Sequence, residues 1–307
     1  MHTPVSTPQD PPQGIPPAEV VITEDLVREL LRSQHPDLNN LELALLGSGW
    51  DNTTFRLGAE LAVRLPRRKL GADLIRKEQR WLPGFAEHLP LPIPTPTRIG
   101  VSGSGYPWPW SIVPWIEGTS ATEQPPRPSE AANLGRFLRA LHRPSPADAP
   151  RNEYRGVPLA ARAKAVEAGL ARMNPGDMAV TVDEVAGAWA RTKTIPIDSA
   201  EVWLHGDLHS RNVIVADGRV AGVIDWGDMC VGDPATDLAA AWMLFPTRAH
   251  RELRDAYGSI SELTWGRARG WAVFFGVVLA DSGAGQDDAW ASIGRRILER
   301  ACSCVPG

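Results

Sequence analysis

The segment HGDLHSRN places several reactive side chains directly before an apolar run, namely His205, Asp207, His209 and Asn212. If this segment were a strand, the alternating His205, Asp207 and His209 would share one face and predict a zinc site. The chain offers no further cluster of His or Cys for a fourth ligand. Zinc hydrolysis is therefore the weaker interpretation of this segment.

Phosphoryl transfer explains more of these residues at once. This chemistry needs a carboxylate that aligns the acceptor hydroxyl and oxygen ligands that hold magnesium. Asp207 has the type and position for the first role, and the amide oxygen of Asn212, five residues later, for the second. Asp225, in the segment VIDWGD, adds a carboxylate that can bridge metal ions. The pattern predicts Asp207 as the catalytic residue and Asn212 and Asp225 as Mg²⁺ ligands.

HGDLHSRN resembles the catalytic loop of the aminoglycoside phosphotransferases, small-molecule kinases that share the protein-kinase fold. VIDWGD resembles the metal-binding segment of that family, and GDPATDLA the helix start that follows it. The three motifs occur in this order within residues 205 to 237. The resemblance begins near residue 23 and weakens across residues 145 to 200 and after residue 245. It implies transfer of the γ-phosphoryl group of ATP or GTP to a hydroxyl of a small molecule.

The resemblance also implies a phosphate-binding turn at GSGWDN, which contains Gly47, Ser48 and Gly49. This turn departs from G-x-G-x-x-G because Asn52 stands where the last glycine would be. A turn of this kind can still approach phosphates through its backbone N–H groups. Taken alone, the turn is more typical of a plain hairpin, and its distance before the segment LAVRLP is what favours the phosphate-binding role.

Further nucleotide contacts are implied at four positions. Arg64 stands where kinases carry a phosphate-pairing lysine, and Glu78 is its natural ion-pair partner. Arginine keeps a permanent charge and binds phosphate bidentately, but its reach differs from that of lysine. At the predicted hinge, the carbonyl of Pro114 and the N–H of Ile116 would bind the edge of the purine, with Val113 as the gatekeeper-like side chain.

The elements that must position these residues can be predicted from hydrophobic periodicity. Thr23 begins a helix, residues 41 to 67 alternate as three antiparallel strands, and residues 72 to 85 return to helical spacing. With two strands in residues 97 to 118, we expect an α+β lobe built on a five-stranded meander with one inserted helix.

The chain becomes mainly helical after Gly118. Ser129 is expected to cap a helix over residues 130 to 142, and further helices are expected in residues 157–193, 233–245 and 261–302. The expected fold is a bilobal, protein-kinase-like α+β fold. Its predicted parts are a disordered Pro-rich lead-in (1–18), a nucleotide-binding lobe with the hinge (19–117) and a helical catalytic and substrate-binding lobe (118–307).

Bulk composition excludes several classes of function. The 307 residues carry a net charge of -4, with no basic excess that would favour nucleic acid. The apolar run at residues 271 to 280 is too short to cross a bilayer, and the N-terminus lacks a secretory pattern. Cys230, Cys302 and Cys304 form no disulfide framework. We therefore expect a cytoplasmic protein without nucleic-acid or membrane partners, and the sequence carries no signal of its oligomeric state.

The acceptor is predicted from charge. Asp228, Asp233 and Asp237 make the catalytic end acid-rich, which favours a cationic aminoglycoside-type antibiotic and hence a role in antibiotic resistance. A structural role competes with this, since Asp237 can cap a helix. The many tryptophans and the apolar run at residues 271 to 280 favour instead a macrolide, and another small alcohol is a further alternative. Arg64 also leaves open a nucleotide-binding module without catalysis.

The remaining polar residues of the opening segment are assigned to structure. We expect His205 to orient the loop by hydrogen bonds. His209 and Arg211 are expected to stabilise the loop or face solvent.

Overall fold

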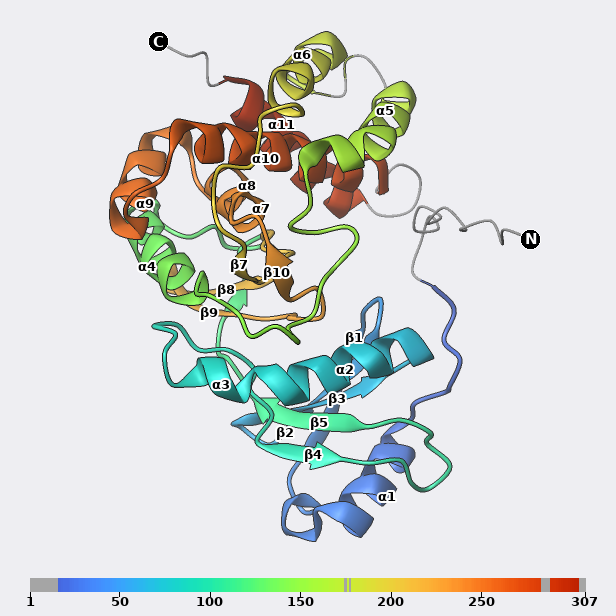
Figure 1. The fold of residues 1–307 in the computed structure, drawn as a ribbon. Coiled ribbons are helices and arrows are strands. Elements are labelled where there is room, and N and C mark those ends of the chain that lie inside the picture. Colours follow the sequence, from blue (N-terminus) through green and yellow to red (C-terminus); the bar gives the residue numbers. More distant parts are fainter. Residues whose placement is uncertain (1–15, 174–175, 177, 283–287, 304–307) are drawn as a thin grey trace, which may run out of the picture.

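The computed structural model describes residues 16–173, 176, 178–282 and 288–303. Apart from residues 16–18, the predicted Pro-rich lead-in lies outside the described residues. The chain forms two bodies, a smaller one built on a sheet and a larger one built mainly of helices (Figure 1). The prediction of a bilobal α+β fold is confirmed.

The smaller body, or N-lobe, comprises one sheet and three helices. In chain order its elements are α1 (Glu24–Gln34), β1 (Leu43–Ser48), β2 (Asn52–Leu57), β3 (Leu61–Pro66), α2 (Lys69–Trp81), α3 (Pro83–Ala86), β4 (Arg98–Gly100) and β5 (Trp110–Pro114), with a 3₁₀ turn at Pro36–Leu38 after α1. The five strands are antiparallel to their neighbours, in the order β1-β2-β3-β5-β4.

This strand order corrects the predicted meander, because β5 pairs with β3 and displaces β4 to the edge of the sheet. The reason is burial. Residues Trp110 to Val113 of β5 are all buried, as suits an inner strand, whereas β4 has three residues of which Arg98 and Ile99 are exposed. Short strands with exposed side chains are tolerated at sheet edges.

The helical body, or C-lobe, carries the remaining elements. They are β6 (Thr119–Ser120), α4 (Ala131–Leu141), α5 (Ala163–Arg172), α6 (Val182–Thr192), β7 (Val202–Leu204), β8 (Val213–Ala216), β9 (Arg219–Val223), β10 (Cys230–Gly232), α7 (Ala235–Leu238), α8 (Ala240–Leu244), α9 (His250–Tyr257), α10 (Glu262–Ser282) and α11 (Asp288–Ser303), with 3₁₀ turns at Pro128–Glu130, Leu159–Arg162 and Thr247–Ala249. The short strands form two small sheets, β6-β8-β9 and β10-β7.

The predicted cap of α4 is wrong. Ser129 lies within a 3₁₀ turn that starts at Pro128, and no side chain caps α4. Proline suits the first position of such a turn because its fixed φ is pre-organised and its missing N–H needs no partner. The carboxylate of Glu130 instead accepts the Val220 N–H at 3.1 Å, which ties the start of α4 to β9.

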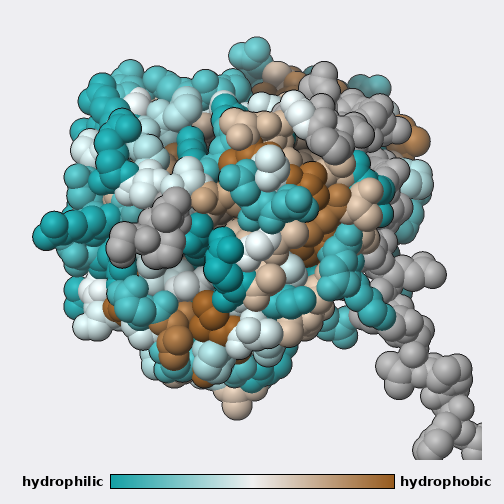
Figure 2. All heavy atoms as spheres, turned by 90° about the horizontal axis from the view of Figure 1, so that it is seen from above, coloured by the Kyte–Doolittle hydropathy of each residue, from teal (hydrophilic) through white to brown (hydrophobic). Residues whose placement is uncertain are grey.

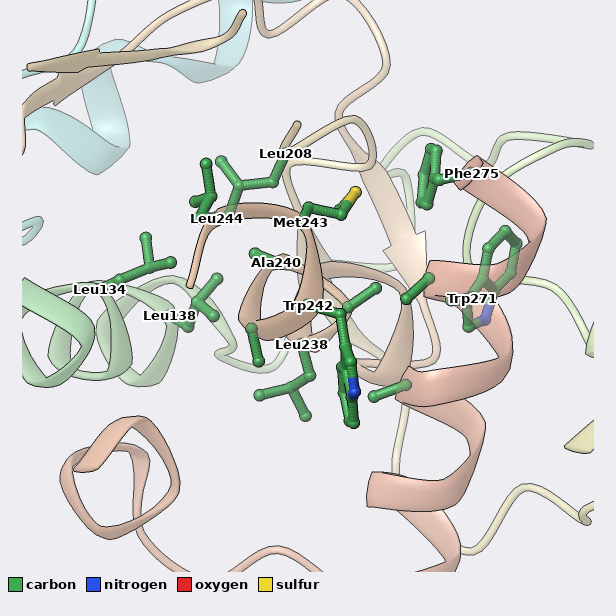
Figure 3. Packing of buried hydrophobic residues seen from close by; sticks show 14 of the residues in the cluster. Leu134, Leu138, Leu208, Leu238, Ala240, Trp242, Met243, Leu244, Trp271 and Phe275 are labelled. Atoms are coloured by element: carbon green, nitrogen blue, oxygen red, sulfur yellow. The ribbon is translucent and has the colours of Figure 1, made fainter. Parts of the chain in front are cut away.

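The C-lobe core gathers around α7 and α8, where α10 and α4 supply further apolar side chains (Figure 3). Leu208, from the segment HGDLHSRN, is buried in this core near Leu244 and Met243 (Figure 3). The outer face seen in Figure 2 is mostly hydrophilic, with separate hydrophobic areas. Among the described helices, none combines the length and hydropathy needed to span a membrane.

The hinge is not the only connection between the two lobes in the described part of the chain. Leu82, Phe85, Leu89 and Ile93 follow α2 in the chain but pack within the C-lobe core cluster. The ring of Phe85 lies 5.1 Å from that of Trp203, and Lys77 of α2 donates to the Met229 carbonyl at 3.1 Å. The end of α2, together with α3, is therefore held by both lobes.

Candidate active site

A cleft of about 790 Å³ lies between the two lobes. The predicted site residues that line it are Gly49, Arg64, Pro114, Ile116, Asp207, Asn212 and Asp225. Gly47, Ser48 and Glu78 do not line it. The hydroxyl of Ser48 pairs across the hairpin with that of Thr53 at 2.9 Å, and Glu78 lies behind Arg64.

The loop between β7 and β8 is shaped by His205. Its Nδ1 accepts the Asp207 N–H at 3.2 Å and its Nε2 donates to the Ile224 carbonyl at 3.0 Å. Both ring nitrogens are thus used to hold the loop, as predicted, and neither is available to a zinc ion. Asn212 closes the loop, because its N–H donates to the His209 carbonyl at 3.0 Å.

Three groups surround the carboxylate of Asp207. Arg155 Nη2 lies 3.1 Å from Oδ1, while His209 Nε2 and Asn212 Nδ2 each lie 3.2 Å from Oδ2. Burial by itself raises the pKa of this carboxyl, but the interactions with His209 and Arg155 outweigh burial and hold the pKa below its ordinary value. Asp207 is therefore ionised at neutral pH and able to orient a hydroxyl group.

The two predicted metal ligands fit a hard cation. The Nδ2 of Asn212 donates to the Asp207 carbonyl at 2.8 Å, which leaves the amide oxygen as the atom for a metal ion. Asp225 is exposed to the cleft and adopts a φ of 62°, a left-handed conformation that is uncommon for a residue with a side chain. Amide and carboxylate oxygens are the ligands that Mg²⁺ prefers. Within the described residues, His, Cys, Asp and Glu form no group of three or more that could hold a metal ion.

Asp237 supports the loop between β7 and β8, which is the catalytic loop predicted from the segment HGDLHSRN. Its two carboxylate oxygens accept the N–H groups of His205 at 2.7 Å and Gly206 at 2.8 Å. His142 Nε2 lies 3.3 Å from the same carboxylate, and His142 Nδ1 lies 2.9 Å from the Tyr257 hydroxyl. The interpretation of Asp237 as a helix cap is wrong, because the residue lies inside α7 and points toward the loop.

The end of the cleft that is predicted to hold the phosphates is marked by a buried ion pair. Arg64 Nη1 lies 2.6 Å from Glu78 Oε2, and the two side chains are 11% and 2% exposed. The predicted pairing of Arg64 with Glu78 is confirmed. Beside it, Arg67 donates to the Gly49 carbonyl at 2.7 Å and so ties the turn between β1 and β2 to the end of β3.

The hinge presents backbone groups to the cleft. The Trp115 N–H donates to the Glu60 carbonyl at 2.7 Å, so Trp115 continues the pairing with the N-lobe sheet. In an extended chain the peptide groups of successive residues point to opposite sides. We therefore expect the Pro114 carbonyl and the Ile116 N–H to point away from the sheet, and both residues line the cleft.

Several residues of the site were not found from the sequence. Arg155, which pairs with Asp207, lies in the irregular segment between α4 and α5, where hydrophobic periodicity gives no signal. The wall of the cleft beyond Asp207 comes from Phe274, Phe275, Val278 and Leu279 of α10 and from Trp290 of α11. The apolar run at residues 271 to 280 was interpreted as favouring an apolar acceptor, but nothing in it indicated which face of the helix would meet the cleft.

A family model described as the phosphotransferase enzyme family matches residues 42–271. The chain belongs to this family. The fold of this phosphotransferase is similar to that of the GDP complex of aminoglycoside 2'-phosphotransferase-IIIa, with a TM-score of 0.67 and 18% identity over 90% of this chain and 97% of that one. It is also similar to the apoenzyme of the macrolide 2'-phosphotransferase MphH from Brachybacterium faecium, with a TM-score of 0.59 and 20% identity over 89% and 97% of the two chains.

One curated relative is similar over a short segment. The uncharacterized protein YcbJ of Bacillus subtilis (strain 168) is 31% identical over 65 residues, which is 21% of this phosphotransferase and 21% of YcbJ. The match thus spans about a fifth of that relative's length.

The carboxylates expected to make an acidic acceptor pocket are all engaged by other groups of this phosphotransferase. Asp233 pairs with the buried Arg267 at 2.7 Å, and Asp237 holds the catalytic loop. Asp228 does line the cleft, but it lies 3.4 Å from Arg155 and accepts from Asn152 at 3.0 Å. Asp233 and Asp237 are therefore engaged within the fold, and Asp228 shares the single positive charge of Arg155 with Asp207.

Proposed function

We propose that this phosphotransferase transfers the γ-phosphoryl group of ATP or GTP to a hydroxyl group of a small molecule. One observation carries the proposal: a single cleft is lined by Asp207, Asn212, Asp225 and Arg64. These residues are an ionised carboxylate, two oxygen ligands and a fixed cation, which is the set that phosphoryl transfer requires.

In this proposal the chain acts mainly by positioning. Asp207 accepts a hydrogen bond from the acceptor hydroxyl, aligns its oxygen with the γ-phosphorus and takes up the proton as transfer proceeds. Asn212 and Asp225 hold Mg²⁺, which when bound neutralises charge on the phosphate oxygens. Arg64, fixed by Glu78, contributes a cation at the phosphate end.

The remaining predicted nucleotide residues have roles in donor binding. The turn that contains Gly47, Ser48 and Gly49 is proposed to cover the phosphates, with Gly49 nearest to them since it lines the cleft. The Pro114 carbonyl and the Ile116 N–H are proposed to bind the purine edge. Backbone recognition suits either ATP or GTP, and the GDP bound to the similar aminoglycoside 2'-phosphotransferase supports a nucleotide donor. Since nucleoside triphosphates are the donors, we place the reaction in the cytoplasm.

The acceptor proposed from the sequence is an aminoglycoside-type antibiotic, with a macrolide or another small alcohol as the alternative. The engaged state of Asp228 and the apolar side chains of Phe274 and Leu279 favour, within this alternative, a small alcohol without an ammonium group. They provide surface for an acceptor with an apolar face rather than free carboxylates for ammonium groups.

The test is a coupled nucleotide-turnover assay with ATP and GTP over a panel of aminoglycosides, macrolides and uncharged or acidic alcohols. We expect magnesium-dependent turnover that rises with at least one alcohol. A cationic acceptor would show a KM that increases with ionic strength, because screening weakens its attraction to the site. Nucleotide binding without turnover on any acceptor would instead support the non-catalytic module suggested by Arg64.

A further inference from the structure

Arg155 occupies the place in the cleft where a cationic acceptor would bind. Its Nη2 lies 3.1 Å from Asp207 Oδ1 and 3.4 Å from Asp228 Oδ2. Its guanidinium carbon lies 5.0 Å from the centroid of the Phe275 ring, within the range of a cation–π contact. The side chain is only 17% exposed.

The fold fixes the backbone that carries Arg155. The next residue, Gly156, has a φ of 68° and packs so closely against Gly232 that an added Cβ would lie 2.8 Å from the Gly232 Cα. Its N–H donates to the Thr236 hydroxyl at 3.2 Å, and its carbonyl accepts the Asp233 N–H at 3.0 Å. The loop is thereby docked on β10 and α7, so the position of Arg155 is a feature of the fold.

The guanidinium group changes what the two carboxylates can bind. An ammonium group beside the reacting hydroxyl would have to displace Arg155 from Asp207 and Asp228, or lie within a few ångströms of it. At such distances two like charges repel each other strongly enough to weaken binding, even in a partly solvated site. The Nε2 of His209 lies 3.2 Å from Oδ2 of Asp207, so the second carboxylate oxygen is also engaged by a side chain of the protein.

The apolar wall beside the carboxylates indicates which kind of surface the acceptor presents to the cleft. Phe275 and Leu279 of α10 line the cleft on this side together with Trp290 of α11. Trp290 is contacted by Arg211, which also lines the cleft and whose guanidinium carbon lies 4.3 Å from the Trp290 ring centroid. Aromatic and aliphatic side chains of this kind bury apolar surface of a ligand.

We infer that Arg155 is a specificity-determining residue, and that the acceptor is an uncharged or acidic alcohol with an apolar body and no ammonium group next to the reacting hydroxyl. The inference rests on the proposed function. Arg155 is also a positioning residue, since it fixes one oxygen of Asp207 and leaves the carboxylate ionised.

The experiment uses two alcohols that share a skeleton. 3-Phenylpropan-1-ol is uncharged, whereas phenylalaninol carries an ammonium group on the carbon next to its hydroxyl-bearing carbon. The apparent constant at which each alcohol stimulates or inhibits magnesium-dependent ATP and GTP turnover is measured for wild type, Arg155→Gln and Arg155→Lys. Arg151→Gln is the matched control, because Arg151 lies on the same loop, is 70% exposed and pairs with Glu201 outside the cleft.

We expect wild type to favour the uncharged alcohol by roughly tenfold or more, as like-charge repulsion requires. Arg155→Gln should remove or reverse this preference, and Arg155→Lys and Arg151→Gln should keep it. Arg155→Gln should also turn over nucleotide more slowly than wild type, because one oxygen of Asp207 is no longer fixed. Millimolar guanidinium chloride should partly restore this lost turnover at concentrations that do not unfold the protein, an effect that a purely structural role would not produce.

Each outcome has a separate meaning. If Arg155→Gln keeps the preference of wild type, the inference is overturned and the kinase function stands. The same holds if wild type turns over nucleotide but neither alcohol changes that turnover. Absence of nucleotide turnover by wild type under every condition overturns the proposed function itself.

Discussion

At the scale of single residues, Asp207 was predictable because its spacing from Asn212 suits only a few kinds of chemistry. Its partner Arg155 was not predictable, because Arg155 reaches it from a loop 52 residues earlier in the chain. An ion pair between side chains so far apart leaves no local pattern. The sequence thus identifies the groups proposed to perform the chemistry, and the structure identifies the groups that surround them.

Replacement of Asp207 by Asn should lower kcat by about 10²-fold or more, because a positioned base is lost. Nucleotide affinity should remain close to that of wild type. Turnover and nucleotide titration measure the two effects. Asp217→Asn, on the exposed turn between β8 and β9, is the matched control and should behave like wild type. A kcat within a few-fold of wild type in Asp207→Asn would remove Asp207 from the mechanism.

The metal ligands should differ in importance. Asp225→Ala should abolish magnesium-dependent nucleotide binding, because it removes a charged ligand. Asn212→Ala removes a neutral ligand and should weaken binding less. Calorimetric titration of Mg-nucleotide into each variant provides the comparison. Binding by Asp225→Ala that equals wild type would show that the metal lies elsewhere.

Arg64 has both a binding and a structural role to test. Burial raises the pKa of the Glu78 carboxyl, and Arg64 opposes this shift by favouring the charged form. Arg64→Ala should therefore weaken nucleotide binding and destabilise the fold by roughly 3–5 kcal/mol, as expected when one partner of a buried pair is removed. Arg64→Lys should restore part of both properties.

Nucleotide titration and urea unfolding distinguish these two effects of Arg64. Arg76→Ala, an exposed arginine of α2 paired with Asp73, is the control. If Arg64→Ala and Arg64→Lys both bind nucleotide like wild type, Arg67 or Arg68 has the phosphate role instead.

At the scale of elements, periodicity predicted most helices and strands but not how they pair. The N-lobe strands alternate clearly, yet the position of β5 between β3 and β4 follows from burial of the segment WSIVP on both faces. The role of Asp237 was missed for a related reason. A carboxylate near a helix start is typical of a cap, and only the tertiary fold brings His205 and Gly206 within reach of it.

Asp237 should control the catalytic loop more than nucleotide binding. Asp237→Asn keeps one acceptor oxygen but turns an N–H donor toward a backbone N–H, so one buried donor loses its partner. We expect a loss of stability of about 1–3 kcal/mol and a kcat reduced by at least roughly tenfold, since misplacing a catalytic group is costly. Asp255→Asn, at an exposed position of α9, is the control. A variant that loses stability but keeps kcat would show that the loop is positioned by other contacts.

At the scale of the whole molecule, the bilobal architecture was predictable from the order of a strand-rich and a helix-rich half. The boundary between their cores was not. Leu82 and Phe85 continue the apolar stripe of the helix that begins at Lys69, so the sequence assigns them to the N-lobe. In the structure they pack with Trp203 and Trp226 of the C-lobe. Residues from α2 and α3 therefore connect the buried pair at Arg64 to the helical core.

This connection predicts that the two lobes unfold together. Phe85 is 4% exposed, and Phe85→Ala should lower the free energy of unfolding by roughly 3–5 kcal/mol, the usual effect of removing a buried aromatic side chain. Leu70→Ala, at a position of α2 that is 54% exposed, should change it by less than about 0.5 kcal/mol. Urea unfolding followed by tryptophan fluorescence and by far-UV circular dichroism measures both variants. Coincident transitions are expected for wild type because α2 contacts β3 and β5 of the N-lobe sheet, while Leu82 and Phe85, which follow it, pack in the C-lobe core. A Phe85→Ala variant as stable as wild type would mean that contacts other than those of Phe85 join the lobes.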